Sequence, residues 1–92
     1  MSMEVGQKLN LQSKKRNLTG EVVEASLLNP GDRHSYSKRD NNPVYRFTIR
    51  VPELKLTLSE QVEITDRVED NLVSSLEEVF SGALARGEGQ SY

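Results

Sequence analysis

The sequence of 92 residues contains no cysteine, no tryptophan and a single histidine, His34. The lack of cysteine excludes disulfide bonds and thiolate metal ligands. A zinc site needs three or four protein ligands, so one imidazole is not enough. A Ser–His nucleophile would depend entirely on His34, which lies in a polar stretch where an exposed histidine is the usual case.

Acidic pairs are present, but none lies in an Asp-rich metal loop or a Gly-rich phosphate loop. Such pairs on strands and helices are usually solvated. The pairs are Glu21/Glu24, Glu60/Glu63 and Glu77/Glu78. We therefore predict a protein that is not an enzyme and that uses no metal, cofactor or small-molecule substrate.

Long apolar runs are also missing. No stretch approaches the roughly twenty residues of a membrane span, and the first four residues lack the apolar segment of a signal peptide. We expect a cytoplasmic protein without membrane contact. Hydrophobic residues make up 35% of the chain and aromatic residues 5%, so the core is expected to be small. We predict one domain over residues 1–86, followed by a flexible tail at 87–92.

The clearest strand pattern lies at residues 45–51. Tyr45, Phe47, Ile49 and Val51 fall on one side of an extended chain, and the intervening Arg, Thr and Arg fall on the other. This period of two in aromatic and β-branched residues is typical of a half-buried antiparallel strand. The strand is therefore expected to lie at the centre of the core.

Further strands are predicted at Glu4–Leu11 and Thr19–Leu28, the second with a bulge or with burial on both sides. Residues 54–65 alternate as two short strands, Leu54–Leu58 and Gln61–Thr65, or as one bent strand. Pro52-Glu53 indicates a tight reversal before them. The expected fold is mainly β (α+β): four or five antiparallel strands in a partly open, OB-like or SH3-like barrel with one C-terminal helix.

The helix is predicted over residues 66–86, where apolar residues recur at intervals of three and four. Asp66 is the expected N-cap, and Glu69 three residues later would complete a capping box. Arg86-Gly87 is the expected end, because a basic residue followed by glycine suits a helix C-terminus.

Charge is distributed unevenly along the chain. Residues 1–50 hold nine Lys/Arg against five Asp/Glu, giving +4, and residues 51–92 hold three against nine, giving −6. A loop of about fourteen residues runs from the turn Asn29-Pro30-Gly31-Asp32 to Asn42-Pro43 and combines cations with an aromatic residue. Cations suit phosphates, and an aromatic ring suits an unpaired base. The predicted contacts to nucleic acid are Arg33, Lys38, Arg39, Arg46, Arg50 and Lys55 for phosphate and Tyr36 for stacking, with Lys14, Lys15 and Arg16 beside them.

Two resemblances bear on this prediction. Residues 46–54 resemble the strand that opens ribbon-helix-helix repressors, but residues 55–58 alternate like a strand where that family has its first helix. Residues 18–22, the polar loop, the central strand and residues 61–64 are similar to small OB-like accessory proteins of conjugative elements that bind single strands. The second resemblance implies non-catalytic binding of single-stranded nucleic acid.

The helix supports an alternative function. If the core were already filled, the apolar stripe of the helix would remain exposed and would pair with a second copy or with another protein. The chain would then be an interaction or assembly module. The residues of that predicted interface are Val68, Leu72, Leu76, Val79, Phe80 and Ala83.

Overall fold

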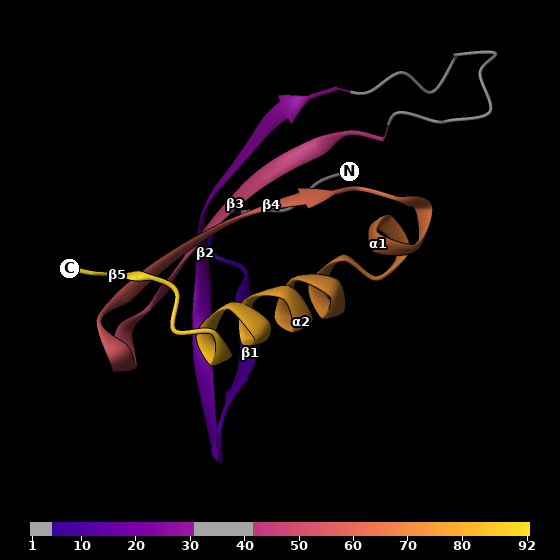
Figure 1. The fold of residues 1–92 in the computed structure, drawn as a ribbon. Coiled ribbons are helices and arrows are strands. Elements are labelled where there is room, and N and C mark those ends of the chain that lie inside the picture. Colours follow the sequence, from indigo (N-terminus) through magenta and orange to yellow (C-terminus); the bar gives the residue numbers. More distant parts are fainter. Residues whose placement is uncertain (1–4, 31–41) are drawn as a thin grey trace, which may run out of the picture.

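The computed structural model describes residues 5–30 and 42–92 (Figure 1). It contains one antiparallel sheet with strands in chain order, a short 3-10 turn between the third and fourth strands, and two helices before the last strand. The elements are β1 (Lys8–Ser13), β2 (Arg16–Asn29), β3 (Val44–Val51), η1 (Pro52–Leu54), β4 (Leu56–Glu63), α1 (Asp66–Asp70), α2 (Leu72–Ala85) and β5 (Gln90–Ser91). The mainly β fold with a C-terminal helical segment is thus confirmed.

The sheet is open and does not close into the predicted OB-like or SH3-like barrel. In the described chain, β1 pairs with β2 alone and β5 with β4 alone. The edge of β1 is occupied by α2 instead of by another strand. The backbone N–H of Asn10 donates to the Glu77 carboxylate at 2.6 Å, and that of Gln12 donates to the Ser81 hydroxyl at 3.0 Å. Side chains of the helix therefore satisfy donors that barrel closure would have paired.

Strand β3 lies in the middle of the sheet, as its alternating pattern predicts. Phe47, Ile49 and Val51 are fully buried, whereas Arg46 and Arg50 point to the opposite, exposed face. The buried side chains of the sheet and of α2 form one apolar cluster. Its members are Leu9, Leu11, Leu18, Val22, Phe47, Ile49, Val51, Leu58, Val62, Ile64, Leu76, Phe80, Ala83 and Leu84.

Strand β2 is long and irregular, and the predicted bulge is confirmed. Its register with β3 shifts between Val22 and Glu24 and again between Leu27 and Asn29. Strand β1 begins later than predicted and is joined to β2 by a two-residue turn at Lys14-Lys15, with Lys14 at a φ of 56°. A lysine in this left-handed conformation places the basic segment at the tip of a tight hairpin.

The reversal predicted at Pro52-Glu53 is the 3-10 turn η1, and it ends at Lys55, which has a φ of 53°. Of the two alternatives for residues 54–65, the structure contains the single strand. Strand β4 pairs with β3 without a register shift from Leu56 to Glu63. No glycine or asparagine interrupts this segment, which explains why the chain does not fold back on itself.

The predicted helix over 66–86 is divided in two by Asn71, whose φ of −132° is not helical. The N-cap is Thr65 rather than Asp66: the Thr65 hydroxyl accepts the backbone N–H of Val68 at 3.2 Å. A hydroxyl one residue earlier makes the same capping bond, which moves Asp66 into the first turn. The C-terminal prediction is confirmed, since Arg86 is the C-cap and Gly87 follows with a φ of 77°.

Residues 87–92 do not form the loose tail that the sequence predicts. Gln90 lies opposite Thr57 and Ser91 opposite Leu56, so β5 extends the sheet beside β4. The backbone N–H of Tyr92 also donates to the Lys55 carbonyl at 3.1 Å. Three backbone positions are thereby fixed against β4 and its preceding turn.

Candidate nucleic-acid interface

The sheet has one face packed against α2 and one polar face that no described helix covers (Figure 1). We call the second the outer face. It carries side chains from the first four strands, and most are hydroxyls, amides or charges. The residues are Lys8, Asn10, Gln12, Thr19, Glu21, Glu24, Ser26, Arg46, Thr48, Arg50, Thr57, Ser59, Gln61 and Glu63.

Arg46, one of the predicted phosphate contacts, forms an ion pair with an acidic residue on β2. Its guanidinium lies 3.1 Å from a Glu24 carboxylate oxygen. The same carboxylate accepts a hydrogen bond from the Ser26 hydroxyl at 2.9 Å. These two bonds, the Ser26 bond first, lower the pKa of Glu24 below its ordinary value. The charge of Arg46 is therefore largely compensated within the sheet.

The predicted contact Arg50 has a different environment. Its guanidinium carbon lies 5.2 Å from the centre of the Tyr92 ring, a cation–π arrangement. The Tyr92 residue is 59% exposed, so the ring is accessible to solvent while one guanidinium lies over it. We call this pair the Arg50–Tyr92 platform.

Tyr92 is not among the contacts predicted from sequence, because residue 92 falls in the segment that the sequence predicts to be loose. The ring reaches Arg50 through β5, a strand of two residues. Such a strand has no periodicity of its own, and the position of the chain depends on the turn at Gly87 and Gly89, which have φ values of 77° and 119°. The one available signal was a tyrosine close to two glycines.

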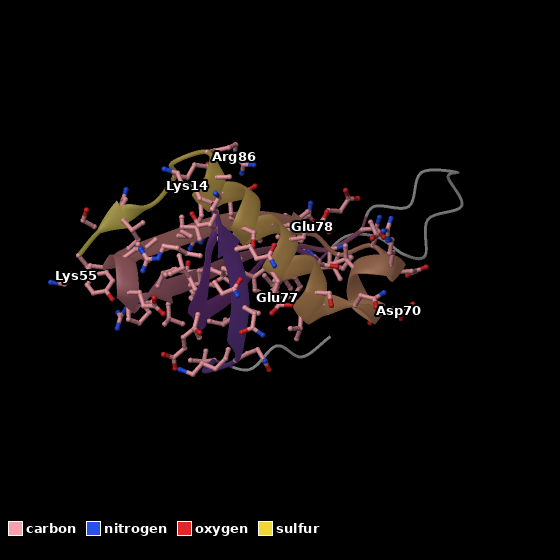
Figure 2. All side chains as sticks on the ribbon, turned by 90° about the horizontal axis from the view of Figure 1, so that it is seen from below. Lys14, Lys55, Asp70, Glu77, Glu78 and Arg86 are labelled. Carbon is pink, nitrogen blue, oxygen red and sulfur yellow. The ribbon has the colours of Figure 1, made fainter. Side chains whose placement is uncertain are left out.

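Cations lie around the platform and at the tip of the β1–β2 hairpin. Figure 2 shows Lys55 and Arg86 toward β5 and Asp70 at the other end, whereas Lys14 lies at the hairpin tip, which projects away from β5 in Figure 1. Lys14 and Lys55 have no ion-pair partner among residues 5–30 and 42–92, whereas Arg16 lies 3.5 Å from Glu53. We define the basic end as Lys14, Lys15, Arg16, Arg50 and Lys55.

Arg86 contributes less positive charge to that end than its position indicates. Its guanidinium lies 2.7 Å from Glu88 and 3.7 Å from Glu60. Burial, followed by the nearby Glu88 carboxylate, raises the pKa of Glu60, and Arg86 partly opposes this effect. The three side chains form a closed ionic cluster between β4 and the end of α2.

Four of the predicted contacts, Arg33, Tyr36, Lys38 and Arg39, lie outside the described residues, as does His34. The structure therefore brings together Arg50 and Lys55 from the predicted set, adds Tyr92, and pairs Arg46 with an acid.

The predicted partner interface on the helix is largely used by the protein itself. Leu76, Phe80 and Ala83 are fully buried against the sheet. The other three residues of that set pack against the same core and are partly buried: Val68, Leu72 and Val79. The stripe thus fills the core that the alternative function assumed to be complete without it.

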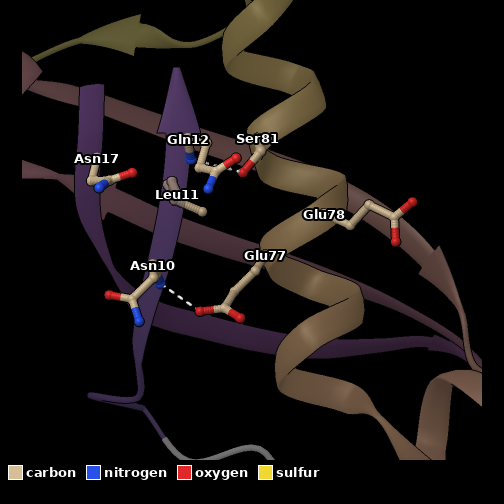
Figure 3. Close-up of a pocket in the computed structure, with 7 residues that line it drawn as sticks. All are labelled: Asn10, Leu11, Gln12, Asn17, Glu77, Glu78 and Ser81. Carbon is tan, nitrogen blue, oxygen red and sulfur yellow. Dashed lines mark hydrogen bonds between the residues drawn. The ribbon is translucent and has the colours of Figure 1, made fainter. Parts of the chain in front are cut away.

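A groove between β1 and α2 is also unsuited to a polyanion (Figure 3). Asn10, Gln12 and Asn17 line one side, and Glu77 and Glu78 line the other. Two carboxylates without a compensating cation in the lining repel phosphate. The basic end is therefore the more suitable surface for a nucleic acid.

Within the described ranges, no three or more His, Asp or Glu side chains are grouped so that they could hold a metal ion. Among the helices of the same ranges, none has the length and apolar character required to cross a membrane. Comparisons with protein-family models, curated proteins and solved structures return no match. Any function must be inferred from the residues of this chain.

Proposed function

We propose that this protein binds single-stranded nucleic acid without catalysis, at the basic end of the outer face. The observation that carries the proposal is the Arg50–Tyr92 platform, an exposed ring with a guanidinium 5.2 Å from its centre. An unpaired base stacks on such a ring, and stacking contributes about 1–3 kcal/mol per base in other proteins of this kind.

Phosphate contacts would come from the cations around the platform. Lys55 is adjacent to Tyr92 through the backbone bond of 3.1 Å between them, and Lys14 and Lys15 form the exposed hairpin tip. Neither Lys14 nor Lys55 has a carboxylate partner in the part of the chain that the structure describes. Lysines without a protein partner are free to exchange their counterions for phosphate.

Single strands fit this surface better than a duplex. Reading of duplex sequence requires a helix or a two-stranded ribbon that enters the major groove. Here α2 buries its apolar side and presents Glu77 and Glu78 near the surface, which a duplex backbone would repel. A stacking ring beside lysines instead matches the sequence-tolerant recognition of unpaired bases.

Arg46 is assigned no direct role, because its charge is compensated by Glu24 at 3.1 Å. Arg33, Tyr36, Lys38 and Arg39 remain predictions from sequence.

Fluorescence anisotropy of a labelled oligothymidylate at two salt concentrations tests the proposal. We expect binding at low salt, with log K falling by about 0.7 per phosphate contact for each decade of salt. Tyr92→Ala should weaken binding by about tenfold or more, since one stacking contact is lost. Arg46→Gln is the matched control, because it removes a cation from the same face that Glu24 already neutralises; we expect about twofold or less. Absence of binding at low salt, or equal losses for both variants, would contradict the proposal.

A further inference from the structure

Among the residues that the structure describes, part of one sheet edge has no neighbouring strand. Strand β2 pairs with β1 from Arg16 to Glu21, and one further backbone pair joins Val22 to the segment before β1. From Val23 to Leu28 the described residues offer β2 only β3 as a neighbour. The N–H and C=O groups along the other edge of this segment can therefore accept an additional strand.

The other two edges of the sheet are protected. The β1 edge donates to Glu77 and Ser81 of α2. The β4 edge is paired with β5 at Leu56 and Thr57, and its remainder includes Glu60 and Glu63. Charged side chains discourage the addition of a strand at an edge.

The free segment of β2 is apolar at its end. Leu27 is 51% exposed and Leu28 is 44% exposed. The segment carries one charged residue, Glu24, whose carboxylate forms an ion pair with Arg46 and accepts a hydrogen bond from Ser26. A strand that pairs with a second copy of itself must not bring like charges opposite each other, and the single, already paired charge of this segment satisfies that requirement.

We infer that a second copy of this chain pairs with the free segment, strand β2 against strand β2, so that the two sheets become one across a two-fold axis. The pairing is antiparallel, because a two-fold axis perpendicular to the sheet reverses the strand direction.

The faces of the side chains require the axis to pass through a residue, and we place it at Ser26. Ala25 and Leu27 lie opposite Phe47 and Tyr45 and share the inner face, whereas Ser26 lies opposite Arg46 on the outer face. Residues directly opposite one another in an antiparallel pair share a face. With Ser26 on the axis, Ala25 of one copy faces Leu27 of the other, and the two Ser26 side chains face each other. The two Glu24 carboxylates are then not opposite each other.

The bulges at Val23 and Leu28 limit the length of the pairing. Register shifts occur at both positions, and a bulged residue disrupts the ladder locally. The new pairing is therefore short, and the dimer belongs to the small, weak class of interfaces that form at high protein concentration.

Sedimentation equilibrium over a range of concentrations measures the association directly. We expect a monomer–dimer equilibrium whose dissociation constant rises by at least about tenfold for Leu27→Lys, because each change acts twice in a two-fold interface. Val73→Lys is the control, since Val73 is an exposed apolar residue on α2, at 38%, and it should leave the equilibrium unchanged. A monomer at every concentration, or a dimer insensitive to Leu27→Lys, overturns the inference.

A cysteine cross-link tests the register, because the chain has no cysteine of its own. Ser26→Cys should form a disulfide-linked dimer on mild oxidation, since side chains opposite each other across two strands lie within disulfide reach. Ser59→Cys is the matched control: it is another outer-face serine, on β4, and should remain monomeric. Efficient cross-linking at residue 59 but not at residue 26 would place the interface elsewhere and overturn the pairing of β2.

Discussion

Arg46 and Arg50 lie on the same strand and on the same face, four residues apart, yet their surroundings differ. Arg46 lies 3.1 Å from the Glu24 carboxylate, and Arg50 lies over an exposed ring. On the opposite face of the same strand, Phe47 and Ile49 are buried in the apolar core. The comparison separates three roles along one strand: packing by Phe47 and Ile49, ion pairing by Arg46, and an accessible cation at Arg50.

Truncation of a buried core residue should have the largest effect on stability. Phe80 is fully buried where α2 packs against the sheet, and its truncation leaves a cavity. We expect Phe80→Ala to lower the free energy of unfolding by about 3–5 kcal/mol, a large share of the stability of a small domain. Urea denaturation followed by circular dichroism measures this. Val73→Ala, on the exposed side of α2, should cost about 0.5 kcal/mol or less. Equal losses for both would show that α2 is not seated on the core.

Sequence alone predicts the parts of the fold that depend on periodicity. The alternation around Phe47 and Ile49 identifies the central strand and its two faces, and spacing by three and four identifies the stripe that contains Phe80. Both patterns extend over several residues, so a single exception does not erase them. The helix end at Gly87 is also predictable, because it depends on one residue with positive φ, 77°.

The features that the sequence does not predict depend on which distant segments of the chain become neighbours in the fold. Arg46 meets Glu24 because a bulge at Val23 sets the register of β2 against β3. The barrel stays open because Glu77 and Ser81 happen to reach the β1 edge. No local sequence pattern indicates either contact, because each contact is made between segments that lie far apart in the sequence. For the same reason Tyr92 could not be assigned to the platform in advance.

The Tyr92 ring can be displaced from Arg50 without removing its side chain. Gly89 has a φ of 119°, and a Cβ there would lie 2.9 Å from a Leu58 methyl carbon. Gly89→Ala should therefore displace β5 and separate Tyr92 from Arg50, with a loss of oligonucleotide affinity close to that of Tyr92→Ala, about tenfold. Anisotropy measures the affinity, and Tyr92→Ala in the same background should add little further loss, because the ring has already left its position over Arg50.

Stability serves as the control for that variant. Because β5 contains only two residues, we expect Gly89→Ala to lower the free energy of unfolding by about 1 kcal/mol or less. If Gly89→Ala kept full affinity while changing the environment of Tyr92, the ring would not take part in binding.

The smallest effect concerns the ionic cluster near the basic end. Burial raises the pKa of Glu60, so its protonated form is favoured by folding. The stabilising contribution of that protonated form is fully present below the ordinary pKa of a glutamate and is lost as pH rises through the raised pKa of the folded state. At neutral pH the charged Glu60 therefore costs stability, although Arg86 at 3.7 Å offsets part of the cost.

Glu60→Gln removes this titrating group while keeping the shape of the side chain. We expect the variant to be more stable than the parent at neutral pH, by about 1 kcal/mol or less. The difference should disappear below pH of about 4, where Glu60 is protonated in both states. Urea denaturation at the two pH values measures it, with the exposed Glu78→Gln as the control, expected to change stability by about 0.5 kcal/mol or less at either pH. A less stable Glu60→Gln at neutral pH would mean that the contact with Arg86 outweighs the burial of the carboxylate.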